Sequence, residues 1–316
     1  MMSNAILMAL VPVFFVLLLG YAAGKFHIVD NLHVDALNAL VMDFALPASL
    51  FAATASASRR EMIEQVPLFL VLGVTMLLVY LAWYFTARGV SKVSRSEASL
   101  QALTIGFPNL AGVGLPIMTS VVGPAGTVPV AVALAAGSIL ISPLTLIMAE
   151  MGAAKARGEQ MAARQVLTAI RRAITKPVVL APALGILFSL SDVSLDALAR
   201  ASLALIGSSA AGVALFLTGA ILSAQSFRLD WKVVAATVAS DIVRPLLAVA
   251  VICLIPMTQD AAKTAILLAA TPSGFFGILF AVNYRLDSAR AGSMVIASTG
   301  FSVVTLAIAI ALLFPH

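Results

Sequence analysis

Two apolar segments of the sequence are interrupted by proline in a similar way. One interruption lies at Pro108 and is followed by Asn109, and the other lies at Pro272 and is followed by Ser273. Proline removes a backbone donor and clashes with the preceding turn, which costs about 3 kcal/mol in a helix interior. Asparagine and serine are both common caps at helix N-termini. The pattern therefore predicts two helices that break and restart in an apolar environment.

Such breaks have the chemistry of an anion-binding site. Each half-helix that starts after a break presents about half a positive charge and free N–H groups. Two such ends that converge in a membrane protein would bind a carboxylate, and carbonyl groups at the opposing C-termini would bind Na⁺ or a proton donor. We predict a substrate site formed by Pro108, Asn109, Leu110, Gly112, Thr271, Pro272, Ser273 and Gly274. The alternative is that these prolines only kink their helices.

Three ionisable residues lie within apolar segments: Asp43, Asp241 and Arg244. Each would cost about 2.5–3.5 kcal/mol at the centre of a bilayer on insertion scales, so a function is expected. Asp241 and Arg244 are three positions apart and share a helix face. Either they neutralise one another, or they have a function: Arg244 would bind the substrate carboxylate, or Asp241 would carry a proton. Asp43 is the second candidate for ion coupling, unless it only reaches the membrane interface.

The composition places these segments in a lipid environment. Of the 316 residues, 61% are hydrophobic and 10% are charged, against about 45–50% and about 25% in soluble domains. The net charge of +5 does not indicate nucleic acid, because the basic residues lie in short loops between apolar runs. The single cysteine, Cys253, allows no intrachain disulfide, and His27, His33 and His316 lie outside the apolar runs. We therefore expect neither a metal site nor a cofactor.

Ten apolar segments are candidates for membrane-spanning helices. About 20 residues are needed, because the hydrocarbon core is about 30 Å thick and each residue adds about 1.5 Å. The segments are Ala5–Gly24, Ala36–Ala55, Val66–Ala87, Leu100–Val122, Val128–Met151, the shorter Pro177–Leu190, Ala201–Leu222, Val233–Ile255, Ala261–Asn283 and Ala291–Phe314. A positive charge follows the first segment rather than preceding it, so we expect a retained helix and not a signal peptide.

Lysine and arginine are distributed unequally over the connecting loops. Most lie in one alternate set of loops, at Lys25, Arg88, Lys92, Arg95, Lys155, Arg157, Arg164, Arg171, Arg172, Lys176, Arg228, Lys232, Arg285 and Arg290. The other set holds Arg59, Arg60, Arg200 and Lys263. Because the basic side is usually cytoplasmic, we expect both termini on the opposite, periplasmic or extracellular side. The stretch 153–172 is predicted to be a basic surface helix.

The two halves of the chain resemble one another. A shift of 165 residues aligns Gly20 with Gly185 and Phe51 with Phe216, and a shift of 164 aligns Pro108 with Pro272. Five helices in each half place the second half in the membrane upside down, as in many secondary transporters.

The predicted organisation is therefore an all-α integral membrane protein with two inverted repeats. They comprise an N-terminal five-helix repeat at 1–151, a cytoplasmic linker at 152–176 and a C-terminal five-helix repeat at 177–316. Small residues from Gly207 to Gly212 make the seventh segment narrow, which favours close helix packing or a dimer contact.

The order of these motifs resembles that of the auxin efflux carrier family. The similar segments are Ala45–Phe51, Phe107–Ile117, Lys176–Pro177 and Thr271–Pro272, and the similarity covers essentially the whole chain. The resemblance implies ten helices in a scaffold domain and a transport domain, as in the similar fold of sodium–bile acid symporters. It also implies that the fourth and ninth helices cross at their prolines.

The resemblance further implies a substrate class. Bacterial members are regarded as transporters of malonate or related organic anions, with Asn109 near the substrate carboxylate. Plant carriers usually have asparagine around the second crossing as well, where this chain has Ser273. A homodimer is also implied.

We therefore predict a secondary active transporter of a small organic anion, such as malonate, in a bacterial inner membrane. It would work by alternating access of the elevator type, in symport with H⁺ or Na⁺, with the lipid bilayer and a second copy as its other partners. The alternatives are an anion channel and a carrier of a larger amphipathic carboxylate, auxin-like or bile acid-like. An enzyme would need clustered catalytic side chains in the spans, and we find too few; a sensor would usually carry a soluble output domain.

Overall fold

The computed structural model of the chain describes residues 2–156, 167–168, 171, 175–191, 195–283 and 289–315. In this part of the chain the regular elements are helices, and β-pairing is confined to one isolated bridge. The all-helical prediction is therefore confirmed for the described residues. Arg157, Arg164, Arg172, Arg285 and His316 lie outside them, as does most of the predicted surface helix over 153–172.

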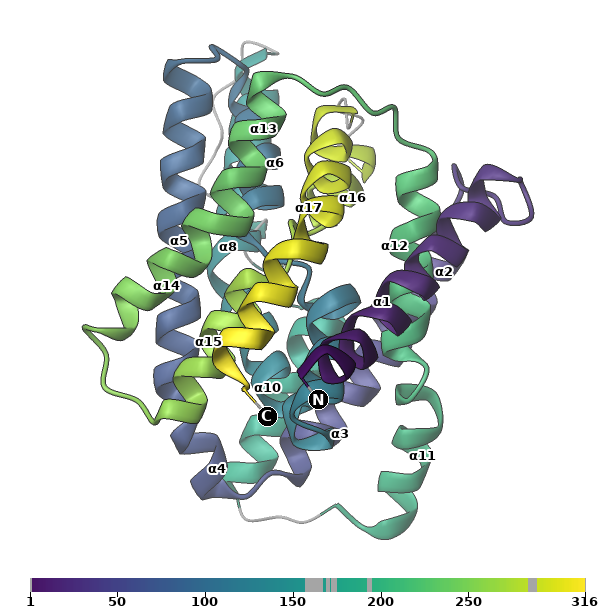
Figure 1. Cartoon of the computed structure of the whole chain (residues 1–316), viewed down its shortest axis with the longest axis vertical. Helices are drawn as coiled ribbons and strands as arrows, with labels where there is room; N and C mark the ends of the chain where they lie inside the picture. Colours follow the sequence, from purple (N-terminus) through teal and green to yellow (C-terminus); the bar gives the residue numbers. More distant parts are fainter. Residues whose placement is uncertain are drawn as a thin grey trace.

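Figure 1 shows helices that run mostly along the long axis of the molecule, with α5 at one edge and α1 and α12 at the other. In chain order the elements are α1 (Met2–Lys25), α2 (Asp35–Ala39), η1 (Leu40–Ala45), α3 (Leu46–Ser56), α4 (Arg59–Glu64), α5 (Val66–Gly89), α6 (Arg95–Gly106), η2 (Leu110–Gly114), α7 (Leu115–Val121), η3 (Pro124–Gly126), α8 (Thr127–Ala156), α10 (Pro177–Leu190), α11 (Ala197–Gly207), α12 (Ala210–Ser223), α13 (Trp231–Val238), η4 (Ala239–Val243), α14 (Arg244–Ile252), α15 (Gln259–Ala270), α16 (Phe276–Asn283) and α17 (Ala289–Leu313).

Seven helices of the described chain are long and apolar enough to cross a membrane. They are Leu7–Lys25, Asp35–Ser56, Arg59–Gly89, Pro124–Ala149, Ala197–Ser223, Trp231–Ile252 and Ala289–Leu313. The three other predicted spans are shorter for physical reasons: the fourth and ninth are divided at their prolines, and the sixth is the 14-residue helix α10. The ten-span arrangement thus stays a prediction, to which we return below.

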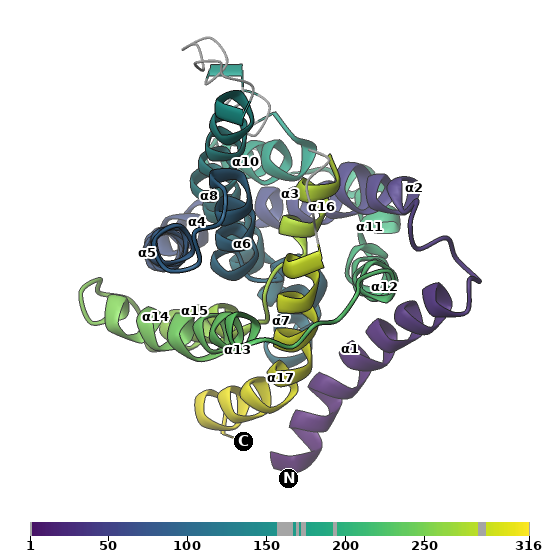
Figure 2. The ribbon, with the colours of Figure 1, turned by 90° about the horizontal axis from the view of Figure 1, so that it is seen from above.

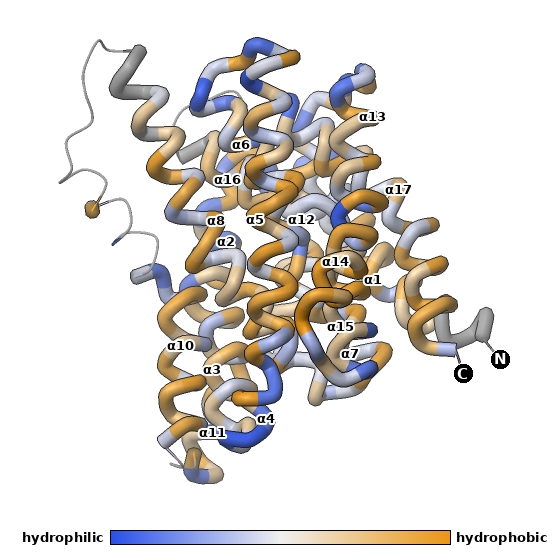
Figure 3. Tube along the Cα trace, turned by 90° about the vertical axis from the view of Figure 1, so that its left-hand side faces the viewer, coloured by the Kyte–Doolittle hydropathy of each residue, from blue (hydrophilic) through white to orange (hydrophobic). Residues whose placement is uncertain are grey.

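The outer surface of the helices is apolar. Phe15, Phe85 and Leu205 are 63%, 67% and 85% exposed, and large hydrophobic side chains are exposed on most of the long helices. Figure 3 shows hydrophobic residues along the middle of the helices and hydrophilic residues mainly at the two ends, around α4 and at the start of α13. Exposing so much apolar surface to water would be unfavourable, whereas contact with lipid would not, so the surface is that of a membrane protein.

Two pairs of helices pack without room for a side chain between their backbones. Helix α1 lies beside α12 (Figure 2), and a β-carbon on Gly20 would lie 2.0 Å from the carbonyl oxygen of Phe216. Helix α10 packs against α3, and a β-carbon on Gly185 would lie 3.0 Å from the carbonyl oxygen of Phe51. Small residues permit such close approach in membranes, where packing rather than hydrophobicity drives helix association.

Three π-helical turns in the described part of the chain each end two residues before a proline. The turns are η1, η2 and η4, and the prolines are Pro47, Pro116 and Pro245. Proline cannot donate to the carbonyl four residues earlier and clashes with it, so the helix widens locally. That carbonyl belongs to Asp43 in η1 and to Asp241 in η4.

Candidate functional site

Two broken helices meet at their prolines. Helix α6 ends at Gly106 before η2 begins at Leu110, and α15 ends at Ala270 before α16 begins at Phe276. The two interruptions, Phe107–Asn109 and Thr271–Phe275, are called the crossing from here on. Polar caps fix the start of both first halves: Ser94 accepts a bond from the Glu97 N–H at α6, and Thr258 caps α15 in the same way.

The crossing satisfies much of its own backbone. Pro108 and Ser273 form an antiparallel bridge, and the Asn109 N–H donates to the carbonyl of Pro272 at 2.8 Å. The Gly274 N–H donates to the carbonyls of Thr104 and Phe107 at 3.0 and 3.1 Å. Irregular backbone at membrane depth is tolerable when it is buried in protein and paired in this way.

Gly274 is required by the closeness of the two chains. A β-carbon on this residue would lie 2.3 Å from the carbonyl oxygen of Phe107. The ring of Phe107 in turn packs against Phe276, with ring centroids 5.1 Å apart, and a β-carbon on Gly137 would lie 2.7 Å from that ring. The crossing is thus held by backbone contact and by one aromatic pair.

Asn109 caps the second half of the first broken helix. Its Oδ1 accepts a bond from the Gly112 N–H at 2.9 Å, whereas its buried Nδ2 has no hydrogen-bond partner among the described residues. Leu110 follows it and is fully buried. Thr218 of α12 approaches the same place, because a β-carbon on Gly112 would lie 2.9 Å from its Oγ1. The side chain of Asn109 therefore holds an NH₂ group inside the protein with both N–H donors unused.

Ser273 follows the proline of the second break, but it lies three residues before α16 begins and its hydroxyl group does not cap that helix. Its N–H donates to Ser298 Oγ of α17 at 2.8 Å, and its own buried Oγ has no partner among the described residues. Thr271, at the other end of the interruption, bonds through its hydroxyl to the carbonyl of Leu268. Each strand of the crossing thus carries one buried side chain with unused hydrogen-bonding capacity, which a ligand or an ordered water molecule could satisfy.

Arg244 is fully buried and reaches both broken helices. Its Nε donates to the carbonyl of Ala269 at 2.9 Å, and its Nη1 and Nη2 donate to the carbonyls of Ile105 and Thr271. These carbonyls belong to the C-terminal ends of α6 and α15. The geometry shows a guanidinium group that caps two helix ends, and it does not test the predicted contact with a substrate carboxylate.

Asp241 does not pair directly with Arg244. Its Oδ1 accepts bonds from Ser240 Oγ at 2.8 Å and Ser298 Oγ at 2.6 Å, and its Oδ2 has no partner among the described residues. Because Ser298 also accepts the N–H of Ser273, the carboxylate is linked to the crossing through one hydroxyl group. Sequence reasoning missed Ser240 and Ser298; the signal was a polar series, Ser298, Thr299 and Ser302, inside an apolar segment.

Asp43 has a different environment, because it is exposed on η1. It lies close enough to Lys176 for its charge to act on that amine. The Lys176 amine lies 4.9 Å from the centroid of the Phe280 ring. Burial lowers the pKa of Lys176, and the negative charge of Asp43 partly opposes that shift. Lys176, at the start of α10, therefore lies near both η1 and α16.

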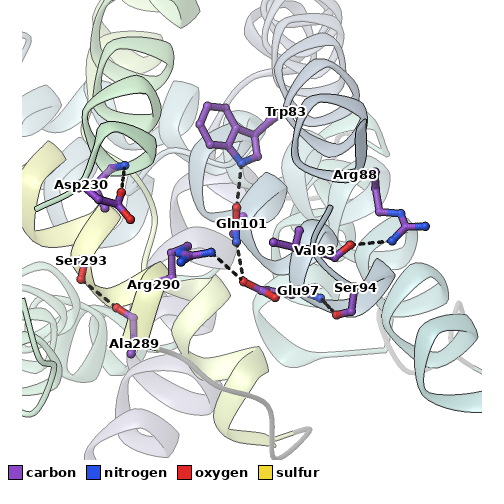
Figure 4. A network of polar contacts seen from close by, with 11 residues as sticks. Trp83, Arg88, Val93, Ser94, Glu97, Gln101, Asp230, Ala289, Arg290 and Ser293 are labelled. Atoms are coloured by element: carbon purple, nitrogen blue, oxygen red, sulfur yellow. Dashed lines mark hydrogen bonds and ion pairs between the residues drawn. The ribbon is translucent and has the colours of Figure 1, made fainter. Parts of the chain in front are cut away.

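A second polar cluster holds the outer end of α6. Glu97 accepts bonds from Arg290 Nη1 of α17 at 3.3 Å and from Gln101 Nε2 at 3.1 Å (Figure 4). Gln101 in turn accepts the indole N–H of Trp83 of α5 at 3.3 Å. The cluster links α6 to α5 and α17. Helix α6 is therefore held at its start by this cluster and at its end by the crossing.

A cavity of about 840 Å³ opens at the end of the molecule where α4 and α11 lie in Figure 1. Its lining includes the acidic residues Glu61, Glu64 and Asp260 and small residues such as Ser49 and Gly207. Its described lining does not include the crossing, whose proline, asparagine and serine residues are buried. The crossing is therefore enclosed in this conformation.

The described residues contain no group of three or more His, Cys, Asp or Glu side chains arranged to hold a metal ion. The free polar groups near the crossing are an amide, a hydroxyl and a carboxylate oxygen. This set can exchange hydrogen bonds or a proton with a small polar ligand.

Comparison with known proteins gives a consistent result. Residues 5–310 match the sequence profile of the family described as membrane transport protein. Similar curated proteins are the "Uncharacterized transporter YfdV" of Escherichia coli (strain K12) and its namesakes in Escherichia coli O157:H7 and Shigella flexneri. Each is 27% identical over 296 residues, which cover 93% of this chain and 93% of the relative. Because the profile spans nearly the whole chain and includes both broken helices, the chain belongs to the membrane transport protein family, the auxin efflux carrier family that its motifs resemble.

Proposed function

We propose that the protein is a secondary active carrier that binds a small organic anion, such as malonate, at the crossing. The observation that carries the proposal is the meeting of two broken helices, each with a buried, unpartnered polar group: Asn109 Nδ2 and Ser273 Oγ. The half-helices that begin at Leu110 and Phe276 add the partial positive charge of their N-termini. A carboxylate would accept hydrogen bonds from both groups and interact favourably with both helix ends.

We further propose that the carrier has ten membrane-spanning segments, arranged as two inverted repeats. The two close helix contacts support it, because Gly20 on Phe216 and Gly185 on Phe51 are related by the same shift of 165 residues. The first helix of each half thus packs on the second helix of the other half. Such intertwined halves provide a scaffold against which a unit that includes the crossing can move, as alternating access requires.

The proposed location is a bacterial inner membrane with both termini on the periplasmic side. The loop between α5 and α6 and the connection from α12 to α13 lie at one end of the molecule, and α4 and α11 lie at the other (Figure 1). The first group belongs to the basic set of loops. We also propose a homodimer. Gly212 lies on the narrow seventh span, and a β-carbon added to it would meet no atom of the same chain within 4 Å.

The enclosed crossing favours a carrier over a channel. A channel needs a continuous polar path, whereas Pro108, Asn109 and Ser273 at the crossing are buried in this conformation. A carrier closes one access route before it opens the other. Transport of a larger amphipathic carboxylate can be tested in the same proteoliposome assay, with that compound labelled in place of malonate.

The test is uptake of labelled malonate into proteoliposomes that contain the purified protein. We expect saturable uptake by the wild-type protein and a loss of most of that uptake in Asn109→Ala, which removes both the free NH₂ group and a helix cap. The cap loss costs about 1 kcal/mol and should leave the protein folded, as size-exclusion chromatography would verify. Unchanged uptake in Asn109→Ala would contradict the site, and the absence of saturable flux for any tested mono- or dicarboxylate would contradict the substrate class.

A further inference from the structure

We infer that the guanidinium group of Arg244 occupies the site, at the C-terminal ends of α6 and α15, where a coupling cation such as Na⁺ would otherwise bind. Carboxylate transport should therefore not depend on Na⁺. The inference about transport rests on the proposed function, whereas the inference about cation occupancy rests on geometry alone.

The charge balance supports this inference. Each helix C-terminus carries about half a negative charge on its unpaired carbonyl groups. Two such ends, those of α6 and α15, converge at the crossing and together carry about one negative charge. One guanidinium group supplies one positive charge, which matches the sum from the two helix ends, and the carboxylate of Asp241 lies near enough to interact electrostatically with the same guanidinium.

The hydrogen bonds show which carbonyl groups the guanidinium neutralises. The guanidinium donates to Ile105 of the first broken helix and to Ala269 and Thr271 of the second. Hard metal cations bind to proteins through oxygen atoms, and backbone carbonyls are common ligands. A Na⁺ ion at this place would need the same carbonyl oxygens, which the guanidinium already occupies.

The neighbouring carboxylate, Asp241, makes no hydrogen bond to the guanidinium among the described contacts. Its Oδ1 accepts bonds from Ser240 and Ser298 instead. The hydrogen bonds of the guanidinium among the described residues therefore all go to the two helix ends. Because arginine stays protonated in proteins, the positive charge is present at every stage of transport.

A tethered cation has a different thermodynamic consequence from a bound ion. Arg244 is covalently part of the chain, at the first residue of α14, so its charge moves only with the protein and is not released on the other side of the membrane. A Na⁺ gradient then supplies no driving force through this place. The substrate end of the crossing is unaffected, because it uses the opposite, N-terminal ends of the half-helices.

The first experiment uses the wild-type protein. Uptake of labelled malonate into proteoliposomes is compared in Na⁺ medium and in choline medium of equal ionic strength, and thermal unfolding is followed in the same two media. We expect equal uptake and equal melting temperatures. Uptake that requires Na⁺, or a melting temperature raised specifically by Na⁺, would overturn the inference.

The second experiment replaces the tethered cation by a free one. In Arg244→Ala we expect lost uptake, a lowered melting temperature, and partial recovery of both when guanidinium ion is added at low concentration. The wild-type protein and Arg244→Lys, which keeps a charge on a flexible stem, should show no such recovery. Arg244→Ala that gains no more from guanidinium than the wild type would overturn the inference.

The readouts separate the two claims. If no tested anion is transported in any medium, the proposed function fails, but the guanidinium-specific rise in the melting temperature of Arg244→Ala still tests cation occupancy. If Arg244→Ala does not yield folded protein, the Na⁺ and choline comparison of the wild-type melting temperature decides the question.

Discussion

At the scale of single residues, the most informative groups are those left with unused hydrogen-bonding capacity. Asn109 Nδ2, Ser273 Oγ and Asp241 Oδ2 are buried without a partner among the described residues. An unsatisfied buried polar atom costs about 1–3 kcal/mol, and three in one region would be expensive without a function. Two of them are suited to a substrate carboxylate, and the third, a carboxylate oxygen, is suited to a proton.

The role of Asp241 leads to a prediction about the driving force. In Asp241→Asn the Oδ1 atom still accepts from Ser240 and Ser298, but the side chain can no longer gain or lose a proton. We expect this variant to lose accumulation driven by a pH gradient and to keep malonate exchange between equal concentrations. Proteoliposomes with an imposed pH gradient provide the first measurement and counterflow provides the second.

Asp43→Asn is the matched variant for this experiment, because it makes the same change at the exposed aspartate of η1. We expect it to keep accumulation driven by the pH gradient. If Asp43→Asn loses that accumulation while Asp241→Asn keeps it, the coupling role belongs to Asp43.

At the scale of elements, the two broken helices are held from both sides. Arg244 caps the ends before the breaks, Asn109 caps one start after them, and backbone bonds join the interruptions. The cluster around Glu97 fixes the outer end of α6 (Figure 4). The geometry of the crossing therefore depends on these hydrogen bonds and on the close approach of two backbones.

A glycine substitution tests that closeness. Gly274→Ala would place a β-carbon 2.3 Å from the carbonyl oxygen of Phe107, so the two chains must separate. We expect a loss of about 1–3 kcal/mol in stability from this overpacking, together with reduced uptake. Thermal unfolding in detergent gives the first quantity.

The control is Gly300→Ala in α17, where a β-carbon meets nothing within 4 Å. Alanine is favoured over glycine in a helix by about 1 kcal/mol, so the melting temperature should stay equal or rise. Equal behaviour of the two variants would show that the crossing is not closely packed at Gly274.

The elements also show how far sequence reasoning reaches. The breaks at Pro108 and Pro272 were predictable because the effect of proline on a helix is local. The partners of Arg244 were not, since Ile105 lies 139 residues away in sequence and depends on how the helices pack. The same holds for the bond between Ser298 and Asp241, which joins residues 57 positions apart. Periodicity predicts elements, whereas such contacts require the three-dimensional arrangement.

At the scale of the whole molecule, the apolar outer surface and the seven long helices describe a protein embedded in lipid. Three predicted spans are too short or too broken to be recognised by length and hydropathy alone. The number of spans matters for function, because an even total places both termini on the same side.

Reporter fusions test this topology. We predict that alkaline phosphatase fused to the C-terminus is active and that a cytoplasm-dependent fluorescent protein fused there is dark. The reason is the excess of lysine and arginine in the alternate set of loops. A bright fluorescent fusion with inactive phosphatase would place the C-terminus in the cytoplasm and contradict the proposed orientation.

The central claim is that a small carboxylate binds between the two broken helices, and a double-mutant cycle of binding tests it most directly. Malonate affinity is measured by calorimetry for the wild-type protein, Asn109→Ala, Ser273→Ala and the double variant. We predict that each single change weakens binding by about 1–3 kcal/mol and that the two effects are coupled, because both groups contact one ligand. Affinity that is unchanged in all three variants would contradict the account.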